Sequence, residues 1–403
     1  MTQRLIFLFV AALTFYLIVL VSLKYTSGDF DVYYDASHNY LTGAPVYIPH
    51  DGINEFKYSP LFALLFSSLT LFNKISALYV WTVFNILCLY AIFFILYKLK
   101  QVSFVNFKDL LILICLFALT GRYIFNDFRL GQVNMFLCFL MVLAMYLEIN
   151  KKFFLASVVL AFCLMVKFFP LLFALYFLLR RHFKLLAYTI LMVAIFLFLP
   201  AIYSGWDLNL KYLHDWFVLL KSTPATLLYS PRNNSLLSYF SWIFIARHEI
   251  GTIFDYLLIK RGLTAEVYYA WGISCLVLFT SFFYGAFFVK EKDPKVRFLD
   301  YSCLFVCALL FNPLSYLNAL VFLIIPYFFI LRYLFYAQLN KKQAFISAFF
   351  IFLSFILNMS DNKVFFKSLS QFYTFLELKP LMWSMILVYI SLWSAKFPLK
   401  LKS

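Results

Sequence analysis

The sequence predicts an all-α membrane protein that crosses the bilayer about twelve times. Three observations predict this class. Hydrophobic residues make up 65% of the chain and charged residues 13%, a balance that disfavours a soluble domain of this length. The apolar residues form long continuous runs, as membrane-spanning helices require. Lysine and arginine gather between those runs, so much of the net charge of +16 is explained by cytoplasmic loops and indicates no nucleic-acid partner.

The first apolar run, Leu5 to Leu23, is long enough to span a bilayer and follows Arg4. A basic residue on that side places the N-terminus in the cytoplasm. The run is too long for a cleaved signal and has no small-residue cleavage site, so we expect a membrane anchor. Residues 24–76 then form the first extracytoplasmic loop.

The stretch Tyr58–Phe72 inside that loop leaves two arrangements open. It is apolar but short, and if it crossed the membrane, the basic segments near Lys98 and Lys151 would lie outside. If it forms an interfacial or re-entrant helix, they lie inside. We prefer the second arrangement, which places both termini in the cytoplasm.

The whole chain, residues 1–403, is expected to form a single integral-membrane domain. Its further crossings are predicted near residues 77–97, 109–125, 133–149, 153–166, 169–180, 185–203, 266–289, 299–312, 315–334, 343–359 and 380–396. Residues 153–180 could instead form one helix broken around Lys167 and Pro170. Residues 204–265 form a long extracytoplasmic loop, in which short apolar pieces such as Leu236–Ile245 suit interfacial helices.

All seven cysteines fall inside apolar runs, and no cluster of cysteine, histidine or acidic residues has the spacing of a metal site. We therefore expect no disulfide, no metal and no cofactor.

Three carboxylates, Asp29, Asp31 and Asp35, follow the first span within seven residues. Asp29 and Asp31 would share a face of an extended segment, whereas Asp31 and Asp35 would share a face of a helix. The acids could simply cap the following helix in a solvated loop. Alternatively, one of them is a general base at the boundary of water and membrane. The spacing by itself does not choose between these interpretations.

A series of short motifs recurs in order between about residues 25 and 320. They are Asp29-Phe30-x-Val32-Tyr33-Tyr34, Ala36, Leu41-x-Gly43, Tyr47, Tyr58-x-Pro60-Leu61, Gly131-Gln132-x-Asn134, Lys167-x-x-Pro170, Asn234-Ser235-Leu236 and Asn312-Pro313-Leu314-Ser315-Tyr316. In this order they resemble glycosyltransferase family 87. Those enzymes are similar to the mycobacterial mannosyltransferases that use polyprenyl-phosphate mannose, and they belong to the wider GT-C superfamily.

The resemblance implies a GT-C fold in the plasma or inner membrane and an inverting transferase. It would move a hexose, with mannose as the first candidate, from a polyprenyl phosphate to a lipid-linked or envelope glycan acceptor on the extracytoplasmic face. Asp29 would be the catalytic base, with Asp31 as the alternative. A transporter or flippase for lipid-linked sugars is the rival function. The absence of an inverted repeat and the gathering of polar residues on one face disfavour it.

The same motifs suggest residues that bind substrate. Arg122 and Arg129 would hold the donor phosphate, although each could instead pair structurally with Asp127. Gln132 and Asn134 would hydrogen-bond sugar hydroxyls, or only pack their helix against its neighbours.

A lysine inside an apolar run should face a water-filled cavity or snorkel to the interface, and we favour a cavity role for Lys167 near the donor phosphate. Tyr33, Tyr58 and Asn234 are placed with the substrate by the resemblance. Family members often carry histidines, which the resemblance places near the donor phosphate, where this chain has Asn318. Asn318 is therefore the donor-binding candidate at that place, and the resemblance does not identify the donor sugar.

Overall fold

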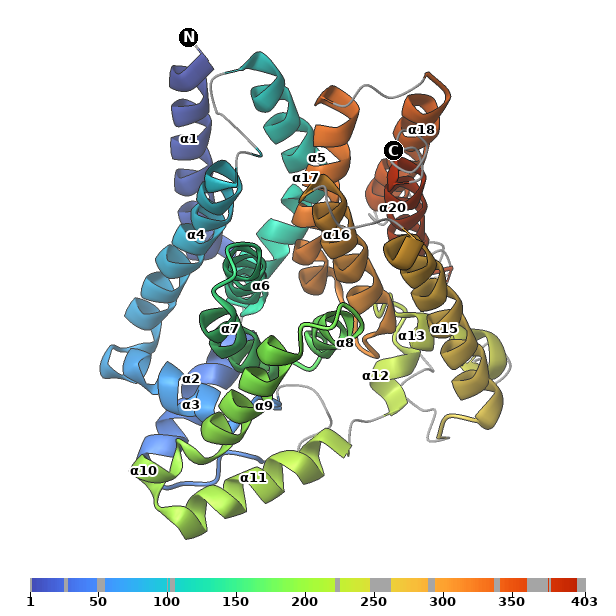
Figure 1. Ribbon diagram of the computed structural model, residues 1–403. Coiled ribbons are helices and arrows are strands. Elements are labelled where there is room, and N and C mark those ends of the chain that lie inside the picture. The colour runs from blue at the N-terminus through green and yellow to red at the C-terminus, as the bar shows by residue number, and fades with distance from the viewer. Residues whose placement is uncertain are drawn as a thin grey trace. The chain divides into compact units, whose positions relative to one another are not determined.

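The computed structural model describes residues 2–24, 28–48, 55–99, 101, 106–221, 225–246, 262–288, 294–336, 341–360, 376 and 378–396, and all regular elements among them are helices (Figure 1). This confirms the all-α prediction for those residues. The chain divides into two compact units. The first comprises Met1–Asp109 and Ile124–Pro224, and the second comprises Leu110–Tyr123 and Ala225–Ser403.

The helices of the first unit are α1 (Thr2–Lys24), α2 (Asp29–Thr42), α3 (Pro60–Phe66), the 3-10 helix η1 (Ser67–Leu71), α4 (Lys74–Lys98), α6 (Asn134–Ile149), α7 (Phe153–Val166), α8 (Leu171–Leu179), α9 (Phe183–Phe198), α10 (Ala201–Ser204) and α11 (Trp206–Lys221). Helix α5 (Phe107–Arg129) contributes residues to both units.

The helices of the second unit are α12 (Ala225–Tyr229), α13 (Leu236–Ser241), the π-helical turn η2 (Trp242–Ala246), α15 (Ala265–Phe288), α16 (Pro294–Phe311), the 3-10 helix η4 (Leu317–Leu323), α17 (Ile324–Tyr336), α18 (Lys341–Ser360) and α20 (Pro380–Lys396). The predicted short apolar piece Leu236–Ile245 is therefore helical.

Every predicted crossing overlaps one or two helices, but not every helix could cross alone. Among the described residues, six helical stretches are long and apolar enough to span a membrane. They are Lys74–Lys98, Phe107–Arg129, Phe183–Ser204, Ala265–Phe282, Leu317–Tyr336 and Lys342–Ser360. The nine residues of α8 extend only about 14 Å, roughly half of a hydrocarbon core. The protein is therefore a membrane protein with several spans, and the total of twelve stays a prediction.

The short apolar stretch after Tyr58 folds as α3 followed by η1. These helices end at Leu71, and their combined length of about 20 Å is too short to cross a bilayer. They pack instead against α2 and the start of α4. The interfacial or re-entrant arrangement of this segment stays a prediction.

Helix α2 carries the three clustered carboxylates. It begins after the extended Gly28 and ends at Gly43, which takes the left-handed conformation with a φ of 70°. Its buried face is formed by Phe30, Tyr33, Ala36, Ser37 and Tyr40, at helical spacing. Because this face packs against the rest of the protein, it determines the position of Asp29 in the first turn of α2.

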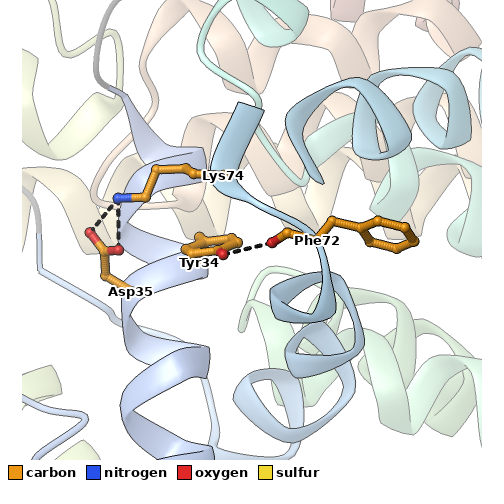
Figure 2. A network of polar contacts seen from close by, with 4 residues as sticks. All are labelled: Tyr34, Asp35, Phe72 and Lys74. Atoms are coloured by element: carbon orange, nitrogen blue, oxygen red, sulfur yellow. Dashed lines mark hydrogen bonds and ion pairs between the residues drawn. The ribbon is translucent and has the colours of Figure 1, made fainter. Parts of the chain in front are cut away.

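The opposite face of α2 is tied to the beginning of α4. Lys74 Nζ lies 2.7 Å from the carboxylate of Asp35, and the Tyr34 hydroxyl donates to the Phe72 carbonyl at 2.8 Å (Figure 2). The Asp35 and Lys74 side chains are largely exposed, so their ion pair contributes little to stability. Asp35 therefore has a surface role.

Helix α11 covers the connections around the site in the first unit. Its Tyr212 hydroxyl donates to the Ala44 carbonyl at 3.1 Å, and Trp216 Nε1 donates to the Lys57 carbonyl at 3.1 Å. The Trp216 ring also stacks on Phe168, with centroids 5.9 Å apart. The long loop predicted after residue 204 thus contains a helix that contacts the Lys57 backbone and the Phe168 ring.

Candidate active site

Asp29 lies at the start of α2 and meets the connection between α5 and α6. Its carboxylate accepts a hydrogen bond from Gln132 Nε2, and the Phe30 N–H donates to the Leu130 carbonyl at 3.3 Å. Burial raises the pKa of the Asp29 carboxyl, while the Lys167 ammonium and the Gln132 amide lower it. The first turn of α2 is thus docked on residues 130–132.

Gly131 makes this close docking possible. It has a φ of 60°, and a β-carbon built on it would lie 2.6 Å from Phe30 Cβ. Its carbonyl accepts a hydrogen bond from Trp81 Nε1 at 2.9 Å. A glycine is required because any other residue would be strained and would push α2 away from Gln132.

Two buried tyrosines extend from the other end of Gln132. The Tyr33 hydroxyl donates to Gln132 Oε1 at 3.0 Å and lies 2.8 Å from the Tyr58 hydroxyl. The two rings meet edge to face with centroids 5.0 Å apart. Tyr58 is held in turn by Tyr47, whose hydroxyl donates to its carbonyl at 2.8 Å.

A second series of hydrogen bonds passes through Asn134, the first residue of α6. Lys167 Nζ donates to Asn134 Oδ1 at 2.5 Å, and Asn134 Nδ2 donates to Asp127 Oδ1 at 2.9 Å. Asp127 also accepts the Met135 N–H at 3.2 Å, which caps the start of α6. Asn134 Nδ2 lies 3.4 Å from Gln132 Oε1, so the two series meet.

Lys167 follows the last residue of α7 in an extended conformation. Burial lowers the pKa of its ammonium, and the carboxylates of Asp127 and Asp29 raise it. The site therefore combines one partly buried cation with two carboxylates in its neighbourhood, an arrangement that can bind an anion and accept a proton.

The structure brings together six of the residues that the sequence singled out, and all of them belong to the first unit: Asp29, Tyr33, Tyr58, Gln132, Asn134 and Lys167. Asp31 lies in the same first turn of α2 and is partly buried. Arg129 Nη2 donates to Asn126 Oδ1 at 3.1 Å, one turn back on α5.

The other three candidates belong to the second unit. Arg122 Nη1 donates to the Asn358 carbonyl at 3.0 Å, Asn234 Nδ2 donates to the Arg232 carbonyl at 2.9 Å, and Asn318 Oδ1 accepts the Ala319 N–H at 3.1 Å. Each of these three hydrogen bonds is made with a backbone group. A role of these residues in substrate binding stays a prediction.

Asp127 and Trp81 were not among the predicted site residues. A buried acid near the end of an apolar helix was a signal for Asp127, which is 1% exposed, but two flanking arginines offered a simpler explanation. Trp81 gave no signal, because a tryptophan in an apolar run is ordinary.

The comparison with protein families identifies the family of the chain that carries this site. A family model described as glycosyltransferase family 87 matches residues 56–313, more than half of the chain. The chain belongs to glycosyltransferase family 87. The match covers Gln132, Asn134 and Lys167 and begins after α2, so Asp29 stands outside it. No curated protein matches this family 87 glycosyltransferase.

Proposed function

We propose that this family 87 protein transfers a hexose from a polyprenyl-phosphate sugar to a lipid-linked or envelope glycan, by a single displacement that inverts the anomeric carbon. The observation that carries the proposal is the Asp29 carboxylate, which is held by Gln132 in the electrostatic neighbourhood of the Lys167 ammonium. Mannose is the first candidate for the sugar. The proposed site faces the extracytoplasmic side of the plasma or inner membrane, with both termini in the cytoplasm.

In this mechanism Asp29 accepts the proton of the acceptor hydroxyl, while the oxygen of that hydroxyl bonds to the anomeric carbon. The bond between that carbon and the phosphate oxygen breaks, and the polyprenyl phosphate leaves with the electron pair. The chemistry requires no nucleotide-binding fold, because the lipid phosphate is itself a competent leaving group. Asp31, in the same turn, is the alternative base.

Lys167 is the proposed partner of the donor phosphate. Its ammonium is balanced by Asp127 and Asp29 in the structure, and a phosphate would supply a further anion for its remaining N–H groups. Lys167 lies where an apolar helix ends, a depth at which a lipid donor could present its headgroup from within the membrane.

The test of this function is the substitution Asp29→Asn. It preserves the size of the side chain and removes its ability to take a proton, so transfer of labelled sugar from polyprenyl phosphate to a membrane-extracted acceptor should fall roughly 100-fold or more. Asp31→Asn should have a milder effect. Asp35→Asn is the matched control on the same helix and should leave transfer intact, since Asp35 is exposed and pairs with Lys74.

If Asp29→Asn is fully active while Asp31→Asn is not, the base is Asp31. If the double variant is also fully active, neither acid takes part in the chemistry and the proposed mechanism is wrong.

A further inference from the structure

Tyr33 and Tyr58 are too enclosed for the substrate-binding role that their motif suggests. Tyr33 is 1% exposed and lies on the buried face of α2. Its ring meets Tyr58, Phe62 and Phe66 edge to face, with centroid distances between 5.0 and 5.6 Å. A sugar could reach the Tyr33 hydroxyl only if this aromatic cluster opened. The hydroxyl must therefore serve a partner inside the protein.

The hydrogen bonds of the two tyrosines run in one direction. A phenol has one hydrogen, and Tyr33 gives its hydrogen to Gln132 Oε1. The 2.8 Å contact with Tyr58 must then be made by the Tyr58 hydrogen on the Tyr33 oxygen. Burial raises the pKa of both phenols, so both remain donors at neutral pH.

The Asp29 carboxylate and the Tyr33 hydroxyl together determine which way the Gln132 amide faces. With its oxygen held by Tyr33, its nitrogen points to Asp29 and donates to the carboxylate. If the amide were reversed, its oxygen would face the carboxylate oxygens, and two acceptors would oppose each other. The donors are thus Tyr58, Tyr33 and Gln132 in that order, and the Asp29 carboxylate is the final acceptor.

We propose that Tyr33 and Tyr58 are positioning residues, which act through Gln132 to hold its amide N–H group on the Asp29 carboxylate. The inference rests on the proposed function in one respect, which is that the carboxylate held by Gln132 is the catalytic base. Hydrogen bonding to the ionised form favours that form. The other charged or titratable groups coupled to Asp29 are Lys167, which favours the ionised form, and Asp127.

The experiment is an infrared titration of the Asp29 carboxyl in the purified full-length protein, without substrate. The difference between the wild type and Asp29→Asn identifies its band. Tyr33→Phe keeps the ring and removes the donor, so the Asp29 titration should move up by about one pH unit. Tyr58→Phe should give a smaller shift in the same direction, because it acts one step further away.

Two further variants make the test specific. Tyr40→Phe removes a buried hydroxyl from the same helix, where it donates to the Pro200 carbonyl, and should leave the titration unmoved. Gln132→Met removes the amide, and adding Tyr33→Phe to it should produce no further shift, since Tyr33 acts through Gln132.

An unmoved titration in both Tyr33→Phe and Tyr58→Phe overturns the proposal, as does an additive shift in the double variant. If Tyr33→Phe does not fold, Tyr58→Phe alone and combined with Gln132→Met gives the same comparison. The titration requires no catalysis, so its outcome is separate from that of the Asp29→Asn transfer assay, which tests the proposed function.

Discussion

Gly131 and Phe30 approach so closely that a β-carbon on the glycine would lie 2.6 Å from Phe30 Cβ. Gly131→Ala should therefore displace the first turn of α2 and separate Asp29 from Gln132. We expect a loss of transfer of at least about 10-fold, the effect of losing one charge-assisted hydrogen bond. The assay is sugar transfer at saturating donor, with the thermal unfolding midpoint measured in parallel.

Gly43→Ala is the control for the strain that a side chain causes at a positive φ, without a close contact. Gly43 also has a positive φ, at 70°, but no atom lies within 4 Å of the position that a β-carbon would occupy. This variant should lose about 1–2 kcal/mol of stability from the left-handed conformation and retain its activity. Equal activity losses in the two variants would contradict the role assigned to the Gly131 contact.

Lys167→Met should impair use of the donor. If the ammonium binds the donor phosphate, its removal should raise the apparent Michaelis constant for polyprenyl-phosphate sugar by about 10-fold or more. Lys152→Met, in the exposed turn before α7, is the control and should behave like the wild type. Unchanged kinetics in Lys167→Met would leave Lys167 as a structural partner of Asn134 only.

The rate of transfer should depend on pH through Asp29. Burial is the largest influence on this carboxyl, so its pKa lies above the ordinary value of 3.8. A base must be ionised, and the rate should therefore fall about tenfold per pH unit below that raised pKa. The measurement is the ratio of turnover number to Michaelis constant as a function of pH. A rate that stays flat down to about pH 4 would contradict an essential Asp29 with a raised pKa.

The second unit contains a closed ring of four hydrogen bonds among buried side chains of α17, α18 and α20. Asn358 Nδ2 donates to the Tyr327 hydroxyl at 3.0 Å, and that hydroxyl lies 2.6 Å from the Ser354 hydroxyl. The Ser354 hydroxyl lies 2.7 Å from the Ser384 hydroxyl, which donates back to Asn358 Oδ1 at 2.7 Å. Ser354→Ala should cost about 1–2 kcal/mol, because it breaks two of these bonds.

The control for that ring is Ser360→Ala on the same helix, where the hydroxyl donates to the Leu357 carbonyl one turn back. Thermal unfolding in one detergent compares the two variants directly. Equal midpoints would show that the ring does not stabilise the contact of these three helices.

The sequence was sufficient to predict the helices, because each long apolar run can satisfy its backbone groups only within itself in a membrane. The start of α2 was harder. The three acids fitted an extended segment and a helix equally well. The structure shows a helix because Phe30, Tyr33 and Tyr40 gain a buried face only at helical spacing.

The candidate site could be anticipated only in part. Lys167 stood out as a charged residue in an apolar run and Gln132 as part of the Gly131-Gln132-x-Asn134 motif, and both lie in the site. Their partners could not be deduced, since the bond from Gln132 to Asp29 joins residues 103 positions apart. Arg122 and Arg129 looked equivalent in the sequence, yet the division of α5 between two units separates their surroundings.

That separation of 103 residues between Asp29 and Gln132 also has a consequence for biosynthesis. At about 5–20 residues per second, a ribosome would complete Gln132 roughly 5–20 s after Asp29. During this interval the nascent loop holds an acid without the amide that orients it. The final docking of α2 must therefore wait until α5 has been inserted into the membrane and the first residues of α6 have emerged.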